Sequence, residues 1–132
     1  MHIVAALFVE GLDMRQAPGP STRLDLLGVM FSLAAPSEPP CTVAPHLVVI
    51  VHEPRYGTGS AALITEFVRQ SDGEQVARNV QLATVEPGRF GRQLVRPELE
   101  FTEYGTIEAH CRINEGGHVI TVPLTLLPPA AG

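Results

Sequence analysis

The stretch "GTIEAHCRINEGGHVITVPLTL", residues 105–126, predicts the fold more directly than any other part of the chain. Apolar and polar residues alternate along it up to the turn signal "NEGG", residues 114–117. Closing the chain over this turn pairs Ile107 with Leu124, Ala109 with Val122, Cys111 with Ile120 and Ile113 with His118. We therefore expect an antiparallel hairpin with one apolar face and one polar face.

The same register bears on the adjacent His110 and Cys111, which would otherwise suggest metal or thiol chemistry. Neighbouring residues on a strand point to opposite faces of the sheet, so Cys111 points toward the core and His110 toward solvent. Zinc sites normally show paired ligands at short spacing, and the sequence has no such pair. We interpret Cys111 as a small buried apolar residue.

A second hairpin is predicted over residues 60–86. Residues 60–70 also fit an amphipathic helix, but a three-residue loop over residues 71–73, with Gly73 in the left-handed region, gives a convincing strand register. That loop places Val68 opposite Val76, Glu66 opposite Arg78, Ile64 opposite Val80 and Ala62 opposite Leu82. The matched apolar and charged pairs favour two strands.

The remaining strands are shorter or less regular. Residues 47–51 are all apolar and lie between His46 and His52, which is typical of a central strand buried on both faces. A strand is expected from Ile3 to Glu10, and another over residues 22–33, where the apolar period shifts. A bulge over Leu26–Gly28, with Gly28 as its pivot, would return those side chains to one face. Pro97 interrupts residues 93–101 and belongs at an edge or a bulge.

These elements predict an all-β fold, an antiparallel immunoglobulin-like β-sandwich of about seven or eight strands. A single domain is expected over residues 1–127, with a frayed tail over residues 128–132. The chain has no tryptophan, and Cys41 falls in residues 34–45, a proline-rich segment that we expect to be a loop. The paired-cysteine core of antibody domains is therefore not expected.

Three segments carry a resemblance to a known family: "VAALFVEGLDMR" (4–15), "TRLDLLGVMFSL" (22–33) and "EYGTIEAHCRINEGGHVITVPLTL" (103–126). The chain resembles small bacterial immunoglobulin-like β-sandwich proteins that form a domain of unknown function. The segments cover under half of the chain, and residues 54–100 match less clearly. The resemblance implies an architecture and brings no activity, substrate or site.

Composition narrows the range of partners. The formal net charge is −5, which opposes binding to the phosphate backbone, so nucleic acid is not expected as a partner. The N-terminus lacks the basic region of a secretory signal, and the apolar run Ile3–Val9 is too short to cross a membrane. We expect a cytoplasmic protein with no membrane partner, in which Cys41 and Cys111 are free thiols.

Candidate reactive groups are sparse. No nucleophile, base and orienting residue combine in a recognised pattern, so we expect no enzyme, no catalytic residue and no cofactor. Gly57 and Gly59 lack the remainder of a phosphate-binding motif and indicate an exposed turn. Arg89, Arg92 and Arg96 surround Phe90 and would suit an anion or an acidic partner. Glu86, Glu98 and Glu100 lie nearby, which favours a salt-bridged face instead.

We therefore predict a non-enzymatic interaction or accessory module that acts through protein–protein contacts, with itself or with a partner. Apolar strands near exposed edges, including the last strand with Pro123, are the motivating feature. The alternative is a small-ligand or metal-binding domain that uses His46, His52 or His118 with Glu53 or Cys111. No metal site is assigned from the sequence, because these residues show no ligand spacing.

Overall fold

The computed structural model describes residues 1–16 and 21–129, which form eleven strands and no helix. The strands are β1 (His2–Gln16), β2 (Thr22–Met30), β3 (Ser32–Ala34), β4 (Cys41–Val43), β5 (His46–His52), β6 (Ser60–Arg69), β7 (Gln75–Thr84), β8 (Phe90–Val95), β9 (Leu99–Phe101), β10 (Gly105–Ile113) and β11 (Ile120–Leu127). Pro128 and Pro129 follow β11 and are exposed, and the rest of the expected tail lies outside the described residues.

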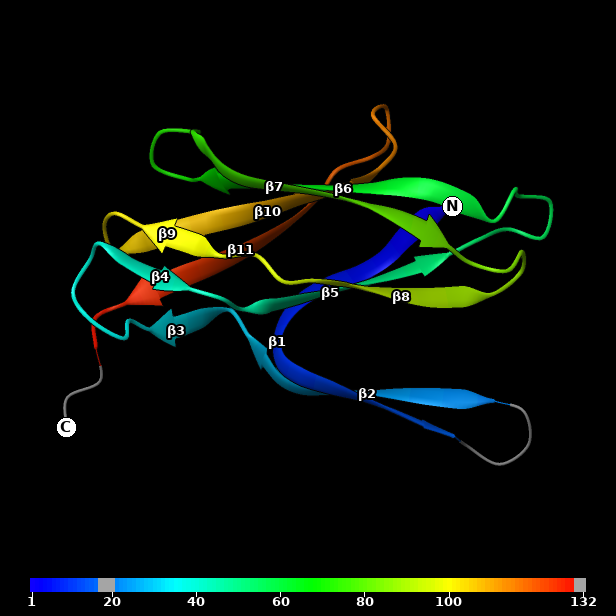
Figure 1. The fold of residues 1–132 in the computed structure, drawn as a ribbon, viewed down its shortest axis with the longest axis horizontal. Coiled ribbons are helices and arrows are strands. Elements are labelled where there is room, and N and C mark those ends of the chain that lie inside the picture. Colours follow the sequence, from blue (N-terminus) through cyan, green and yellow to red (C-terminus); the bar gives the residue numbers. More distant parts are fainter. Residues whose placement is uncertain (17–20, 130–132) are drawn as a thin grey trace.

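Two sheets face each other in a sandwich-like arrangement (Figure 1). One has the order β2-β1-β5-β8, the other β3-β11-β10-β6-β7, and β4 pairs with β9 in a small third ladder. The all-β fold is confirmed. The prediction of seven or eight antiparallel strands is wrong in detail, because β3, β4 and β9 are three residues each, and β3 pairs with β11 in parallel. Segments this short have too few alternating residues to be detected as strands.

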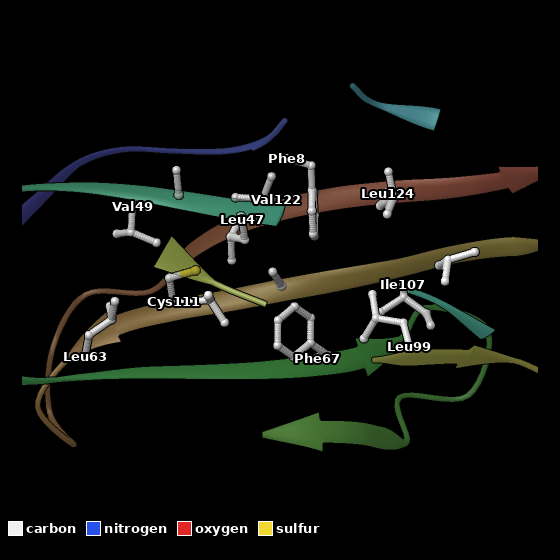
Figure 2. Close-up of a cluster of buried hydrophobic side chains, with 14 of the residues drawn as sticks. Phe8, Leu47, Val49, Leu63, Phe67, Leu99, Ile107, Cys111, Val122 and Leu124 are labelled. Atoms are coloured by element: carbon white, nitrogen blue, oxygen red, sulfur yellow. The ribbon is translucent and has the colours of Figure 1, made fainter. Parts of the chain in front are cut away.

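The core lies between the two sheets (Figure 2). Phe8 and Leu47 from one sheet and Leu63, Phe67 and Ile107 from the other have at most 1% of their surface exposed. Each such side chain stabilises the folded state by about 1.5–3 kcal/mol relative to an exposed one. The packing of the two inner faces is therefore the main stabilising contribution to the fold.

Both predicted hairpins are present. In β10–β11, Ile107 pairs with Leu124, Ala109 with Val122 and Cys111 with Ile120, as expected. The exception is His118, which lies before the first residue of β11. In β6–β7 the pairs Ala62–Leu82, Ile64–Val80 and Glu66–Arg78 are confirmed, and Gly73 has a φ of 73°. A register shift at Phe67/Val68 sets Val68 opposite Gln75, so its predicted pairing with Val76 is wrong.

The first hairpin is longer than the sequence indicated. β1 continues past Glu10 to Gln16 and pairs with β2 without a register shift, from Phe8–Met30 to Gln16–Thr22. The predicted bulge over Leu26–Gly28 is therefore wrong. Gly28 is still a special position, because its φ of 61° lies in the left-handed region. We call residues 10–16 and 21–30 the β1–β2 arm.

The β1–β2 arm extends alongside β5 and β8 (Figure 1). Leu12 of the arm lines a hollow with Leu94, and Met14 and Leu24 line another with Ile50. Val48 is only 1% exposed although it does not belong to the main core cluster. The prediction that residues 47–51 form an interior strand buried on both faces is thus confirmed for all but the partly exposed Ile50.

Candidate interaction surface

Strand β2 forms an open edge of its sheet. Among the described residues it pairs with β1 alone, and it is nine residues long. Leu27 and Val29 are 48% and 39% exposed, and Phe31, directly after the strand, is 67% exposed. A long apolar edge strand presents unpaired backbone donors and acceptors to any strand that approaches it. We call Leu27, Val29 and Phe31, with the backbone of β2, the β2 edge.

The absence of a bulge is the reason that these side chains are exposed. Leu24 and Leu26 point to one face of β2 and Leu27 and Val29 to the other, because the pairing with β1 is continuous. Only the first pair is turned toward the body of the protein, where both residues are partly buried. The strand is therefore apolar on both faces while the fold covers one of them.

A different arrangement protects the edges of β7 and β8. The Gln81 side chain donates a hydrogen bond to the carbonyl of Leu94 at 3.0 Å, and Gln93 donates to the Gln81 side chain at 3.1 Å. Gln93 also donates to the carbonyl of Leu82 at 3.3 Å. These contacts join the edge strands of the two sheets. Side-chain amides thus occupy backbone acceptors on β7 and β8, whereas the β2 edge has no such cover among the described residues.

The histidines of the metal-binding alternative do not meet. His46 and His52 are at opposite ends of β5, which separates them by about 20 Å at the rise of a strand. The His52 ring instead contacts those of His2 and Phe90, with centroid distances of 5.3 and 4.5 Å. His118 lines a hollow with Met1 and His2. No three histidine, cysteine or acidic side chains in the described part of the chain are arranged to hold a metal ion.

Glu53 forms a buried ion pair at the end of β5. Its carboxylate Oε1 lies 2.9 Å from the Met1 ammonium, and its Oε2 accepts the backbone N–H of Gly59 at 2.8 Å. Only 2% of the side chain is exposed. The hydrogen bond from the ammonium lowers the pKa of Glu53 and outweighs burial, which acts in the opposite direction. The carboxylate is therefore kept ionised and used to anchor the N-terminus.

The turn after Glu53 is built around this carboxylate. A Cβ on Gly57 would lie 2.3 Å from Oε1 of Glu53, so the close approach requires glycine. Tyr56 and Thr58 are exposed, as expected of a turn, whereas Gly59 is buried. The sequence interpretation missed this anchoring role. Its only signal was an acidic residue directly after a buried strand, followed by Gly-x-Gly.

Both cysteines are buried and free. Cys111 is fully covered in the core, and burial raises the pKa of its thiol to about 11. Cys41 lies in β4 instead of a loop. A thiol with so high a pKa is neutral at physiological pH and a poor nucleophile. The interpretation of Cys111 as a buried residue is confirmed, and His110 points the other way and contacts Glu108 at 3.2 Å.

The outer face of β6, β7 and β10 carries a network of ion pairs. Arg112 binds Glu66 across the strands and Glu115 at 3.1 Å, and Arg78 lies 3.8 Å from Glu66. The Arg112 guanidinium is the main reason that the pKa of Glu66 is lowered. The partners neutralise each other on this face. We interpret it as a solvated surface held together by charge pairs.

The three arginines around Phe90 do not form the expected salt-bridged face. Arg89 lies 4.0 Å from Glu86, but Arg92 and Arg96 form no ion pair with any described residue. Arg92 instead directs its Nε at the sulfur of Met14, at 2.7 Å. Glu98 and Glu100 lie beyond β8, where Pro97 has ended the strand. The interpretation of a fully paired face is therefore wrong for Arg92 and Arg96.

Compared with known proteins, the chain matches no protein-family model, and no curated protein matches it. The resemblance to small bacterial sandwich proteins stays a prediction from the sequence. Within residues 1–16 and 21–129, no helix could cross a membrane.

Proposed function

We propose that the protein is a non-enzymatic interaction module that acts through protein–protein contacts at the β2 edge. The exposure of Leu27, Val29 and Phe31 beside an open edge strand is the observation that carries the proposal. A strand added there would satisfy the free backbone groups of β2 and cover apolar side chains in one step. The other long edge, β7, has the carbonyl of Leu82 occupied by the Gln93 side chain and is linked to β8.

The partner that we propose is a second copy of the chain. Two identical strands in antiparallel pairing are related by a two-fold axis, so one edge on each copy is sufficient to close a dimer. The dimer would join two four-stranded sheets into one continuous sheet. The sequence of β2 supports this mode, because the strand has no proline and its charged residues, Arg23 and Asp25, precede Leu27 and Val29.

Light scattering coupled to size-exclusion chromatography tests the proposal over a range of concentrations. We expect a dimer that the double variant Leu27→Arg, Val29→Arg converts to a monomer. The matched control is Val80→Arg, Leu82→Arg, because these side chains are 50% and 72% exposed on β7, whose edge is covered. A chain that stays monomeric at high concentration, or a dimer that only the β7 variant disrupts, would overturn the proposal.

We further propose that the sandwich is immunoglobulin-like and that the protein is cytoplasmic and has no nucleic-acid or membrane partner. Two facing sheets built mainly from antiparallel hairpins support the first point. Two free cysteines support a reducing compartment. The negative net charge opposes binding to nucleic acid.

A further inference from the structure

A groove runs between the β1–β2 arm and β8. Met14 and Leu24 line its first part with Ile50 and Phe90, and Leu12 lines the second part with Leu94. Arg92 lines both parts, so the two hollows are adjoining sections of one surface. We call this surface, which includes Leu12, Met14, Leu24, Arg92, Leu94 and Arg96, the arm groove.

The arm groove is positively charged in an acidic protein. Arg92 and Arg96 line it with Arg23 from the arm, and no aspartate or glutamate is among the lining residues. The chain as a whole has a net charge of −5. Arg15, Arg69, Arg78, Arg89 and Arg112 all contact carboxylates, whereas Arg92 and Arg96 have no acidic partner in the described part of the chain. Two guanidinium groups are thus available to an anion from outside.

The shape of the groove favours an extended ligand. Arg92, Leu94 and Arg96 are every second residue of β8 and its extension and line the same hollow, so the two arginine Cα atoms lie about 13 Å apart with an apolar residue between them. Met14, Phe90 and both arginines are exposed, so the groove is open along its length. Small ligands are usually enclosed by pockets that bury most of their surface. An open groove with alternating charge and apolar contact suits a peptide instead.

We infer that the arm groove binds an extended acidic peptide of a partner protein, with apolar side chains between its carboxylates. Each carboxylate would accept hydrogen bonds from a guanidinium, whose planar donors match it in geometry. The apolar side chains would contact Leu12, Leu24 and Leu94. This inference goes beyond the proposed dimer, because it concerns the other side of the arm and a partner of different chemistry.

Fluorescence anisotropy with a labelled peptide of alternating glutamate and leucine tests the inference on the full chain. We expect saturable binding that weakens with added salt, as attraction between exposed charges is screened. A peptide of alternating lysine and leucine should not bind. Arg92→Gln and Arg96→Gln should each weaken binding about tenfold, since a charged hydrogen bond contributes at least that factor.

Arg55→Gln is the matched control, because Arg55 is exposed, forms no ion pair among the described residues and lies outside the groove. It changes the net charge equally and should leave the affinity unchanged. Equal weakening by Arg55→Gln would show charge attraction without a site and would overturn the inference. So would tighter binding of laurate, an anion with a single apolar chain, or no binding of the glutamate–leucine peptide.

A negative result for the dimer would leave the peptide-binding inference standing, and the reverse is also true, because the two tests change different residues. The variant Leu27→Arg, Val29→Arg alters the β2 edge and leaves the residues of the arm groove in place. We expect it to bind the acidic peptide with unchanged affinity even where it no longer forms a dimer. Arg92→Gln also removes the contact between Arg92 and Met14. Arg96→Gln is therefore the second variant, and it keeps the test valid if Arg92→Gln disturbs the packing of the arm.

Discussion

Glu53 shows how one buried charge organises the N-terminal end of the sandwich. Replacing it by glutamine keeps the size of the side chain but leaves the Met1 ammonium buried beside a neutral group. Breaking a buried pair in this way is strongly destabilising, because the remaining charge has lost its solvent and its partner. We expect Glu53→Gln to lower the Tm by several degrees in thermal unfolding. Glu86→Gln is the control, because Glu86 is 77% exposed, and its Tm should match that of the wild type.

The pH dependence of this effect has a definite sign. The pKa of Glu53 is lowered in the folded protein from an ordinary value of 4.5. Its contribution to stability is therefore fully present above about pH 4.5 and is lost as the pH falls toward the lowered value. The difference in Tm between wild type and Glu53→Gln should be fully present just above pH 4.5 and shrink in stronger acid. A difference that grows as the pH falls would contradict the assignment.

Among the elements, the β1–β2 arm depends most on a single backbone position. Gly28 has a positive φ, and a Cβ there would lie 2.5 Å from the side chain of Glu10. We expect Gly28→Ala to reduce the free energy of unfolding by about 1–2 kcal/mol, the usual cost of the left-handed conformation for other residues. Gly11→Ala is the control on the opposite strand, because a Cβ there meets nothing within 4 Å. If urea unfolding gave equal losses of unfolding free energy for Gly28→Ala and Gly11→Ala, Gly28 would have no special role.

The β1–β2 arm is also the part of the fold that the apolar pattern of the sequence predicted least well. Alternation placed the pairs of β10–β11 and most of those of β6–β7 correctly, because each hairpin contains its own turn signal and its own apolar face. The same reasoning imposed one apolar face on residues 22–33 and so required a bulge. Nothing local to β2 indicated that its sheet leaves one of two apolar faces uncovered. The exposed Leu27 and Val29 were therefore found only from the structure.

Contacts between distant segments account for the other differences. The parallel pairing of β3 with β11 joins residues that lie more than 90 positions apart, and no repeating pattern in three residues could indicate it. The pairing of Met1 with Glu53 likewise depends on β1 lying beside β5. Arg92 lacks its expected carboxylate because the arm, and not the acidic segment after Pro97, lies next to it. Local pattern gives the strands, whereas the surfaces depend on how the strands are assembled.

At the scale of the whole molecule, the edge strands on the two sides of the sandwich differ in whether side chains cover their backbone groups. Gln81 and Gln93 connect β7 to β8 and cover that side, while β2 is left open on the other. This asymmetry is the reason that we propose the β2 edge, and not the β7 edge, as the site of contact. If both sides were open, each copy would offer two edges, and strand pairing could continue from copy to copy instead of closing as a dimer.

The bridge between β7 and β8 is therefore expected to limit assembly as well as to stabilise the fold. Gln81→Ala removes two of its three hydrogen bonds, and we expect the free energy of unfolding to fall by roughly 1–3 kcal/mol. Amide hydrogen exchange in β7 should become faster, and light scattering should detect species larger than a dimer. Gln75→Ala, at the exposed start of the same strand, is the control and should change none of these. If Gln81→Ala changed neither the rates of amide hydrogen exchange in β7 nor the mass measured by light scattering, packing between the sheets, and not the bridge, would keep this side closed.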